Sequence, residues 1–146
     1  MVIHDIARTV AEAEFYKGKG EHRFRVTHNG EIFYKSSEGY KKPKDCDKNF
    51  NFVVLAKWIA TPSMPFFNTI NEAVNKNLYT QNMVSSDDRK GKVQFYKSKD
   101  KYYWRFKYLN GRIAGSSFKG FKTFDEMFDN FTMVLCRKWK VVKEEK

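Results

Sequence analysis

The sequence predicts an α+β fold, a single compact domain over residues 1–146 in which two tandem βββα repeats surround an inserted linker. Two observations lead to this prediction. A series of sequence motifs occurs twice in the same order, and in each copy alternating apolar and polar residues precede apolar residues at helical spacing. We expect repeat 1 at 13–58, a linker with a short helix at 59–91, and repeat 2 at 92–139, with the repeats related by a pseudo-two-fold axis.

The duplication rests on motifs that match in order along both copies, with small insertions in two loops. A chance match of this length and order is not expected, so we interpret it as an internal repeat. The matched motifs are aromatic-Tyr-Lys (15–17 and 95–97), Arg-Phe-basic (23–25 and 105–107), Asn-Gly (29–30 and 110–111), Ser-Ser (36–37 and 116–117) and Gly-aromatic-Lys (39–41 and 120–122).

Each copy is expected to begin with three antiparallel strands. In the stretch YYWRFKYLNG, Trp104 and Phe106 fall on one face of a strand, whereas Arg105 and Lys107 fall on the other. The Asn-Gly pair that follows supplies the positive φ angles that a tight hairpin needs. The pattern therefore predicts hairpins with one apolar and one basic face.

A helix is expected at the end of each copy. Thr123 and Glu126 have the spacing of a capping box at the start of the second helix, and Pro43 stands where the first helical residue of the other should be. In the linker, Thr69 and Glu72 repeat the capping-box spacing, which predicts a short helix near Asn68–Leu78.

The charge of the chain makes polyanions candidate partners. Its formal net charge is +11, with 28 basic against 17 acidic residues, and the excess lies in the repeats, at +4 over 13–58 and +7 over 92–139. Such a field concentrates phosphate-bearing ligands near the surface. The alternative interpretation is that these side chains are ordinary solvated strand residues whose stems cover the sheet.

The leading hypothesis is a non-enzymatic protein that binds nucleic acid, DNA or RNA, through the basic faces of its sheets and mainly through phosphates. Tyrosines beside the basic residues would stack on bases or ribose. The candidate nucleic-acid-binding residues are Lys17, Arg23, Arg25, Lys97, Arg105, Lys107, Tyr16, Tyr96 and Tyr103.

The rival hypothesis is a protein-interaction or regulatory module that uses the segment 59–91. Met64, Phe66 and Phe67 are the candidate anchors, because Met and aromatic residues are common at interface centres. The alternative role for the two phenylalanines is to attach this segment to the shared core. A monomer and a homodimer joined through an edge strand both remain open.

Catalytic chemistry finds little support in the sequence. The three histidines show no metal-ligand or nucleophile–base spacing, and Cys46 and Cys136 fit the buried stripes of their helices as small apolar residues. We expect no enzyme activity, no cofactor and no metal. The longest apolar run is far shorter than a membrane helix, so we expect a cytoplasmic protein without a membrane partner.

The motif set resembles that of a known family. The stretch NGEIFYKSSEGYKKPKDCDKNF at 29–50 and its looser copy at 110–131 are similar to the YegP-like family of small proteins often built from two tandem copies. The resemblance covers most of the chain, which departs from the family's usual spacing through the segment between the copies. It implies a βββα tandem fold and carries no established catalytic residue.

Overall fold

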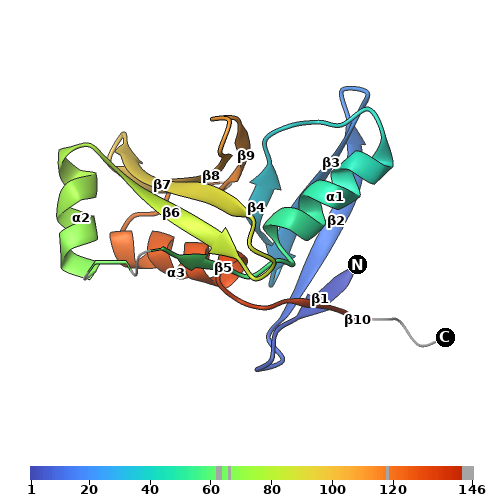
Figure 1. The fold of residues 1–146 in the computed structure, drawn as a ribbon, viewed down its shortest axis with the longest axis horizontal. Helices are drawn as coiled ribbons and strands as arrows, with labels where there is room; N and C mark the ends of the chain where they lie inside the picture. Colours follow the sequence, from blue (N-terminus) through green and yellow to red (C-terminus); the bar gives the residue numbers. More distant parts are fainter. Residues whose placement is uncertain (62–63, 66, 118, 143–146) are drawn as a thin grey trace.

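The protein is a mixed α/β structure with one large antiparallel sheet. The computed structural model describes residues 1–61, 64–65, 67–117 and 119–142. Within these residues the sheet has ten strands, and three helices pack on it. Figure 1 shows α1 over β2 and β3 at one end of the sheet and α2 near β6 at the other.

The strands lie side by side in the order β10-β1-β2-β3-β4-β9-β8-β7-β6-β5, and every neighbouring pair is antiparallel. The two centremost strands, β4 and β9, therefore join the earlier part of the chain to the later part. The strands are β1 (Val2–His4), β2 (Val10–Gly18), β3 (Glu21–His28), β4 (Glu31–Ser36), β5 (Trp58–Ala60), β6 (Leu78–Ser85), β7 (Lys90–Ser98), β8 (Lys101–Tyr108), β9 (Ile113–Ser116) and β10 (Lys140–Val142).

Two short strands cross between the parts of the chain. We call residues 1–60 the first half and residues 78–142 the second half. β5 leaves the first half and pairs with β6, so that Trp58 lies opposite Ser85. β10 leaves the second half and pairs with β1, so that Val142 lies opposite Val2 (Figure 1). Each half thus supplies the edge strand of the other.

The helices are α1 (Pro43–Val53), α2 (Phe67–Lys76) and α3 (Phe124–Leu135). Pro43 is the first residue of α1, as predicted. The predicted cap of α3 is also confirmed, because the Glu126 backbone N–H donates to Thr123 Oγ1 at 3.2 Å. The capping box predicted at Thr69 is wrong, since α2 begins two residues earlier and Thr69 lies inside it.

The segment 59–91 contains more structure than the predicted linker with one helix. The short helix is confirmed as α2. The segment also holds most of β5, all of β6 and the start of β7, and β1 and β10 extend the sheet beyond the βββα pattern. Of the described residues between β5 and β6, those of α2 lie outside the sheet.

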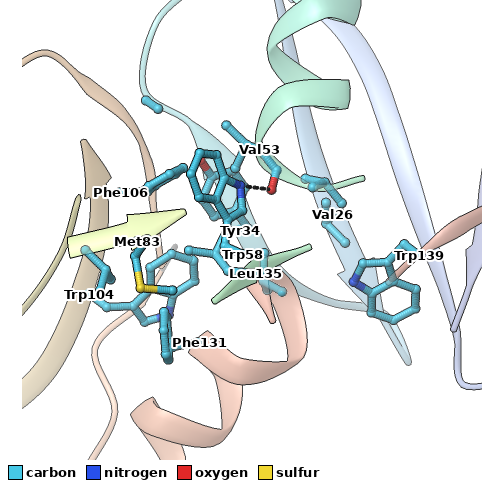
Figure 2. Close-up of a cluster of buried hydrophobic side chains, with 14 of the residues drawn as sticks. Val26, Tyr34, Val53, Trp58, Met83, Trp104, Phe106, Phe131, Leu135 and Trp139 are labelled. Carbon is cyan, nitrogen blue, oxygen red and sulfur yellow. Dashed lines mark hydrogen bonds between the residues drawn. The ribbon is translucent and has the colours of Figure 1, made fainter. Parts of the chain in front are cut away.

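A shared aromatic core fills the space between the sheet and the helices (Figure 2). Tyr34 from the first half stacks on Trp104 from the second at 5.4 Å between ring centroids, and Trp104 meets Phe131 of α3 edge-on at 5.8 Å. Both crossing segments also anchor to a helix end. The Trp58 indole N–H donates to the Val53 carbonyl and the Trp139 indole N–H to the Met133 carbonyl, each at 3.1 Å.

Candidate nucleic-acid interface

The sheet has one face covered by the helices and one face open to solvent. Phe24 of β3 is buried against Phe50 of α1, with ring centroids 5.3 Å apart. The residues on either side of Phe24, Arg23 and Arg25, are only partly buried because successive side chains of a strand point to opposite faces. The second half shows the same division, with Trp104 buried and its neighbour Arg105 partly exposed.

Seven of the nine predicted nucleic-acid-binding residues lie on the open face, and two do not. Lys17 is directly opposite His22, and Lys97 is directly opposite Tyr102, whose ring meets Phe124 of α3 at 6.1 Å. This register places both lysines on the helix-covered face, so their assignment to the basic face is wrong. The residues on the open face are Tyr16, Arg23, Arg25, Tyr96, Tyr103, Arg105 and Lys107.

In the first half, Arg25 is held between an acid and a ring. Its Nε donates to Glu14 Oε2 at 2.7 Å, and its guanidinium carbon lies 5.0 Å from the centroid of the Tyr16 ring. Arg23 lies directly opposite Tyr16 and forms a looser ion pair with Glu21 at 3.8 Å. Carboxylates therefore neutralise both arginines of this half.

In the second half, Arg105 has the same surroundings without the acid. Its Nε donates to the amide oxygen of Gln94 at 2.8 Å, and its guanidinium carbon lies 4.9 Å from the centroid of the Tyr96 ring. Tyr96 stacks in turn on Tyr103, with centroids 5.5 Å apart and an interplanar angle of 12°. The positive charge of Arg105 thus has a neutral hydrogen-bond partner and remains uncompensated.

Two hydrogen-bonded serines show which positions of the halves correspond. Ser36 Oγ bonds both the N–H and the carbonyl of Phe24, and Ser117 Oγ bonds both groups of Trp104. Phe24 therefore corresponds to Trp104, and Arg25 corresponds to Arg105. The match of 23–25 with 105–107 that the sequence predicts is therefore out of register by two residues.

A third basic residue, Lys92, joins this site, although the sequence analysis did not select it. Lys92 on β7 lies directly opposite Lys107 on β8, and both are partly exposed on the open face. Within the part of the chain that the structure describes, no carboxylate lies within 4.0 Å of a Lys92, Arg105 or Lys107 nitrogen. Like charges directly opposite on paired strands are unfavourable, so this arrangement is one that a bound anion would stabilise. We call Lys92, Arg105 and Lys107 the basic cluster.

The tyrosine beside the cluster remains a hydrogen-bond donor at neutral pH. Burial raises the pKa of Tyr96, and the neighbouring Arg105 guanidinium lowers it only in part. The phenol is therefore protonated over the physiological range and offers its O–H to an acceptor. The Tyr96 ring already contacts Tyr103 and Arg105, which favours contacts to phosphate oxygens over stacking on bases.

Two of the three residues of the rival hypothesis, Met64 and Phe67, contact the core. Phe67 at the start of α2 packs edge-on against Phe124 and Phe128 of α3, with centroids 4.7 and 5.7 Å apart. Met64 is partly buried against the same core. Phe66 lies outside the described residues. Phe67 therefore helps to attach this segment to the core, the alternative role that the sequence left open, although it remains 37% exposed. The protein-interaction role of these residues stays a prediction.

The cysteines are poor nucleophiles. Burial raises the pKa of Cys46 to about 11, and burial also raises the pKa of Cys136 to about 11, so both thiols stay protonated at neutral pH. Among residues 1–61, 64–65, 67–117 and 119–142, no three His, Cys, Asp or Glu side chains gather as metal ligands.

Comparisons with known proteins identify no relative, since no family model, no curated protein and no solved structure matches this chain. The resemblance to the YegP-like family therefore stays a prediction. Of the helices in the described ranges, none has the length and apolar character needed to cross a bilayer.

Proposed function

We propose that the chain is a tandem repeat whose unit is ββββαβ, longer than the βββα unit expected from the sequence, with the last strand of each unit exchanged. Three observations support this. From either edge, the sheet begins with the last strand of one unit and continues with the four other strands of the other unit in chain order. Ser36 and Ser117 make equivalent bonds. Trp58 and Trp139 each cap the helix of their own half. A pseudo-two-fold axis between β4 and β9 relates the units.

We propose that this protein is a non-enzymatic nucleic-acid-binding protein that contacts phosphates through the open face of its second half. The observation that carries the proposal is the basic cluster, in which Lys92 opposes Lys107 beside an arginine with a neutral partner. Phosphates spaced along a strand of nucleic acid are anions that such a row of charges accommodates. The paired arginines of the first half contribute less, because they already have carboxylate partners.

The phosphate contacts dominate the proposed mode of binding. The two lysines of the basic cluster act as point charges, and the Nε of its one arginine is already bonded to Gln94. The cluster therefore has few fixed planar donors with which to read a base sequence. The chain acts in the reducing cytoplasm, which suits the free thiols of Cys46 and Cys136.

A matched pair of variants tests the proposal. Fluorescence polarisation is measured with labelled duplex DNA, single-stranded DNA and RNA between about 50 and 200 mM salt. Arg105→Ala is expected to weaken binding and reduce the salt slope by about 0.9 for duplex and 0.7 for single strands. Arg25→Ala, at the corresponding position, should leave the slope nearly unchanged, and Glu14→Gln should raise affinity by freeing Arg25.

Two results would contradict the proposal. Wild-type protein that fails to bind any of the three probes at the lowest salt would show that the charge serves no phosphate contact. Equal losses in Arg25→Ala and Arg105→Ala would show that binding does not depend on the uncompensated cluster.

A further inference from the structure

A cavity of about 610 Å³ lies on the helix-covered side between β4, the turn at 119–122 and α3. Its volume is in the range of small-molecule sites. Phe33, Phe121 and Met133 give it apolar walls, and its charged residues, three lysines and three acids, balance one another. The residues that line it are Glu31, Phe33, Lys101, Lys119, Gly120, Phe121, Lys122, Glu126, Asp129, Asn130 and Met133.

One lining residue has a buried donor without a partner. Asn130 is only 5% exposed, and its Oδ1 accepts a hydrogen bond from the Trp104 indole at 2.6 Å. An indole N–H can only donate, so the amide oxygen has to face Trp104, and this fixes the position of the amide nitrogen. The Nδ2 of Asn130 has no hydrogen-bond partner among the described residues. A buried donor left unsatisfied is costly, which makes the site one that a ligand acceptor would stabilise.

The corresponding residue of the first half, Asn49, shows what the second half lacks. Asn49 and Asn130 each stand directly before a buried phenylalanine of their helix, Phe50 and Phe131. The Nδ2 of Asn49 donates to the hydroxyl of Tyr108, which reaches it from β8 of the other half. A phenol from the protein itself therefore satisfies the amide nitrogen of Asn49, whereas the Oδ1 of Asn49 has no hydrogen-bond partner among the described residues. The cavity beside Asn49 is smaller, at about 360 Å³.

Among the described residues, no phenol forms a hydrogen bond to the Nδ2 of Asn130. Phe24 corresponds to Trp104, so the position on β3 that corresponds to Tyr108 is His28, four residues further along in each case. The His28 ring packs on Phe33, with centroids 5.3 Å apart, and forms no hydrogen bond to Asn130. His28 itself does not line the cavity, but Phe33, on which its ring packs, is one of the cavity's walls.

We propose that the cavity beside Asn130 binds a small neutral phenol whose hydroxyl oxygen accepts the Nδ2–H of Asn130 and whose ring packs against Phe33, Phe121 and Met133. The Asn130 nitrogen is fully covered in the free protein, so binding moves the lining side chains that separate it from the cavity. The apolar walls suit an aromatic ring, and the balanced lining charges favour a ligand without net charge. The inference uses the proposed correspondence between the halves and is independent of nucleic-acid binding.

Titration with p-cresol, followed by ¹⁵N-resolved NMR, tests the site. The side-chain amide signals of Asn130 and the backbone signals of 119–122 should shift and saturate, with a dissociation constant on the order of 1 mM or tighter for a ligand this small. Those of Asn49 should not move. Toluene, which has the ring without the hydroxyl, should bind at least several-fold more weakly and leave the Asn130 amide unshifted.

Two variants separate the site from other binding. His28→Tyr gives the second half a phenol at the position of Tyr108 and should abolish p-cresol binding. In the free variant, the side-chain amide signal of Asn130 should lie near its position in the wild-type complex with p-cresol. Met133→Phe introduces the residue found at the corresponding position Phe52 and should reduce binding by filling the cavity.

Absence of saturable shifts with wild-type protein would overturn the proposal, as would toluene binding as tightly as p-cresol. Unaltered p-cresol binding by a folded His28→Tyr protein would also overturn it. Polarisation with nucleic acid is unaffected by p-cresol if the open face and the cavity act separately, so failure of either proposal leaves the other intact.

Discussion

Replacing Asp5 tests how strongly the turn after β1 fastens the end of the chain to the first half. Asp5 is only 4% exposed, and its Oδ1 accepts the Thr9 backbone N–H at 2.8 Å. Its Oδ2 accepts from the guanidinium of Arg137, which also donates to Thr9 Oγ1 at 3.1 Å. Arg137 lies between α3 and β10, so this carboxylate joins the crossing strand to the turn beside it.

The expected loss follows from these bonds. Hydrogen bonds to charged groups contribute about 1.5–3 kcal/mol each, and the 41% exposure of the Arg137 side chain reduces its share. We expect Asp5→Ala to lower the free energy of unfolding by about 2–3 kcal/mol. For a domain of this size that corresponds to a fall in Tm of about 6–10 °C, measured by calorimetry at pH 7.

Acid should reproduce part of this loss. Burial alone raises the pKa of Asp5, but the Thr9 amide and Arg137 outweigh it, so the pKa is lowered from its ordinary value of 3.8. The unfolded chain then takes up the proton more readily than the folded one. The contribution of Asp5 is therefore present above about pH 3.8 and is lost as the pH falls through the lower folded value.

Two further variants show which contact of Asp5 causes the loss of stability in Asp5→Ala. Ser85 occupies the corresponding turn of the second half and accepts the Arg89 backbone N–H with its Oγ at 3.0 Å. Asp5→Ser should therefore keep the turn, lose only the contact to Arg137 and cost less than Asp5→Ala. Asp87→Ala removes an exposed carboxylate and should change Tm by no more than about 2 °C. If Asp5→Ala is no more destabilising than Asp87→Ala, the inference that Asp5 fastens the crossing strand is wrong.

Two other substitutions probe elements described above. Thr123→Ala removes the cap of α3 and should cost about 1 kcal/mol in thermal or urea unfolding, whereas Thr69→Ala, inside α2, should be neutral; equal effects would contradict the cap. Gly115→Ala would place a methyl group against the Tyr34 hydroxyl oxygen and 2.6 Å from the Lys35 backbone carbonyl, where β4 meets β9, and it should cost more than about 2 kcal/mol in urea unfolding. Gly18→Ala, with no contact nearer than 3.6 Å, is the control, and equal unfolding midpoints would refute the close packing.

The long elements could be predicted from the sequence because their patterns are long. Alternation marks β3 and β8, the Asn-Gly pair after each of them predicts the returning strands β4 and β9, and the helical spacing marks α1 and α3. β1, β5 and β10 have only three residues each, too few for a period to emerge. β6 is longer, but its core-facing positions include the polar residues Gln81 and Ser85 while Leu78 and Val84 face solvent. Its identity as a strand depends on pairing with β7, which local sequence does not encode.

The sequence predicted only part of the open-face site, because assigning a side chain to a face requires the parity of its strand. Strand parity, counted from a buried residue such as Ala13, separates Tyr16 from Lys17, and the same count from Phe95 would have excluded Lys97 and included Lys92. The contrast between Glu14 and Gln94 is visible in the sequence once Arg25 is matched with Arg105. That match requires the hydrogen bonds of Ser36 and Ser117, because the Arg-Phe-basic motif at 23–25 resembles 105–107 more closely than the corresponding residues 103–105.

The exchanged strands also determine when each half can finish folding during synthesis. β5 and its partner β6 leave the ribosome in close succession, so the second half finds its edge strand already made. β1 is made early, yet its partner β10 follows only after every other strand. The first half therefore keeps an unpaired strand edge at β1 until β10 has been synthesised. Pairing of β1 with β10 is a slow step, because these two strands have the longest sequence separation in the sheet.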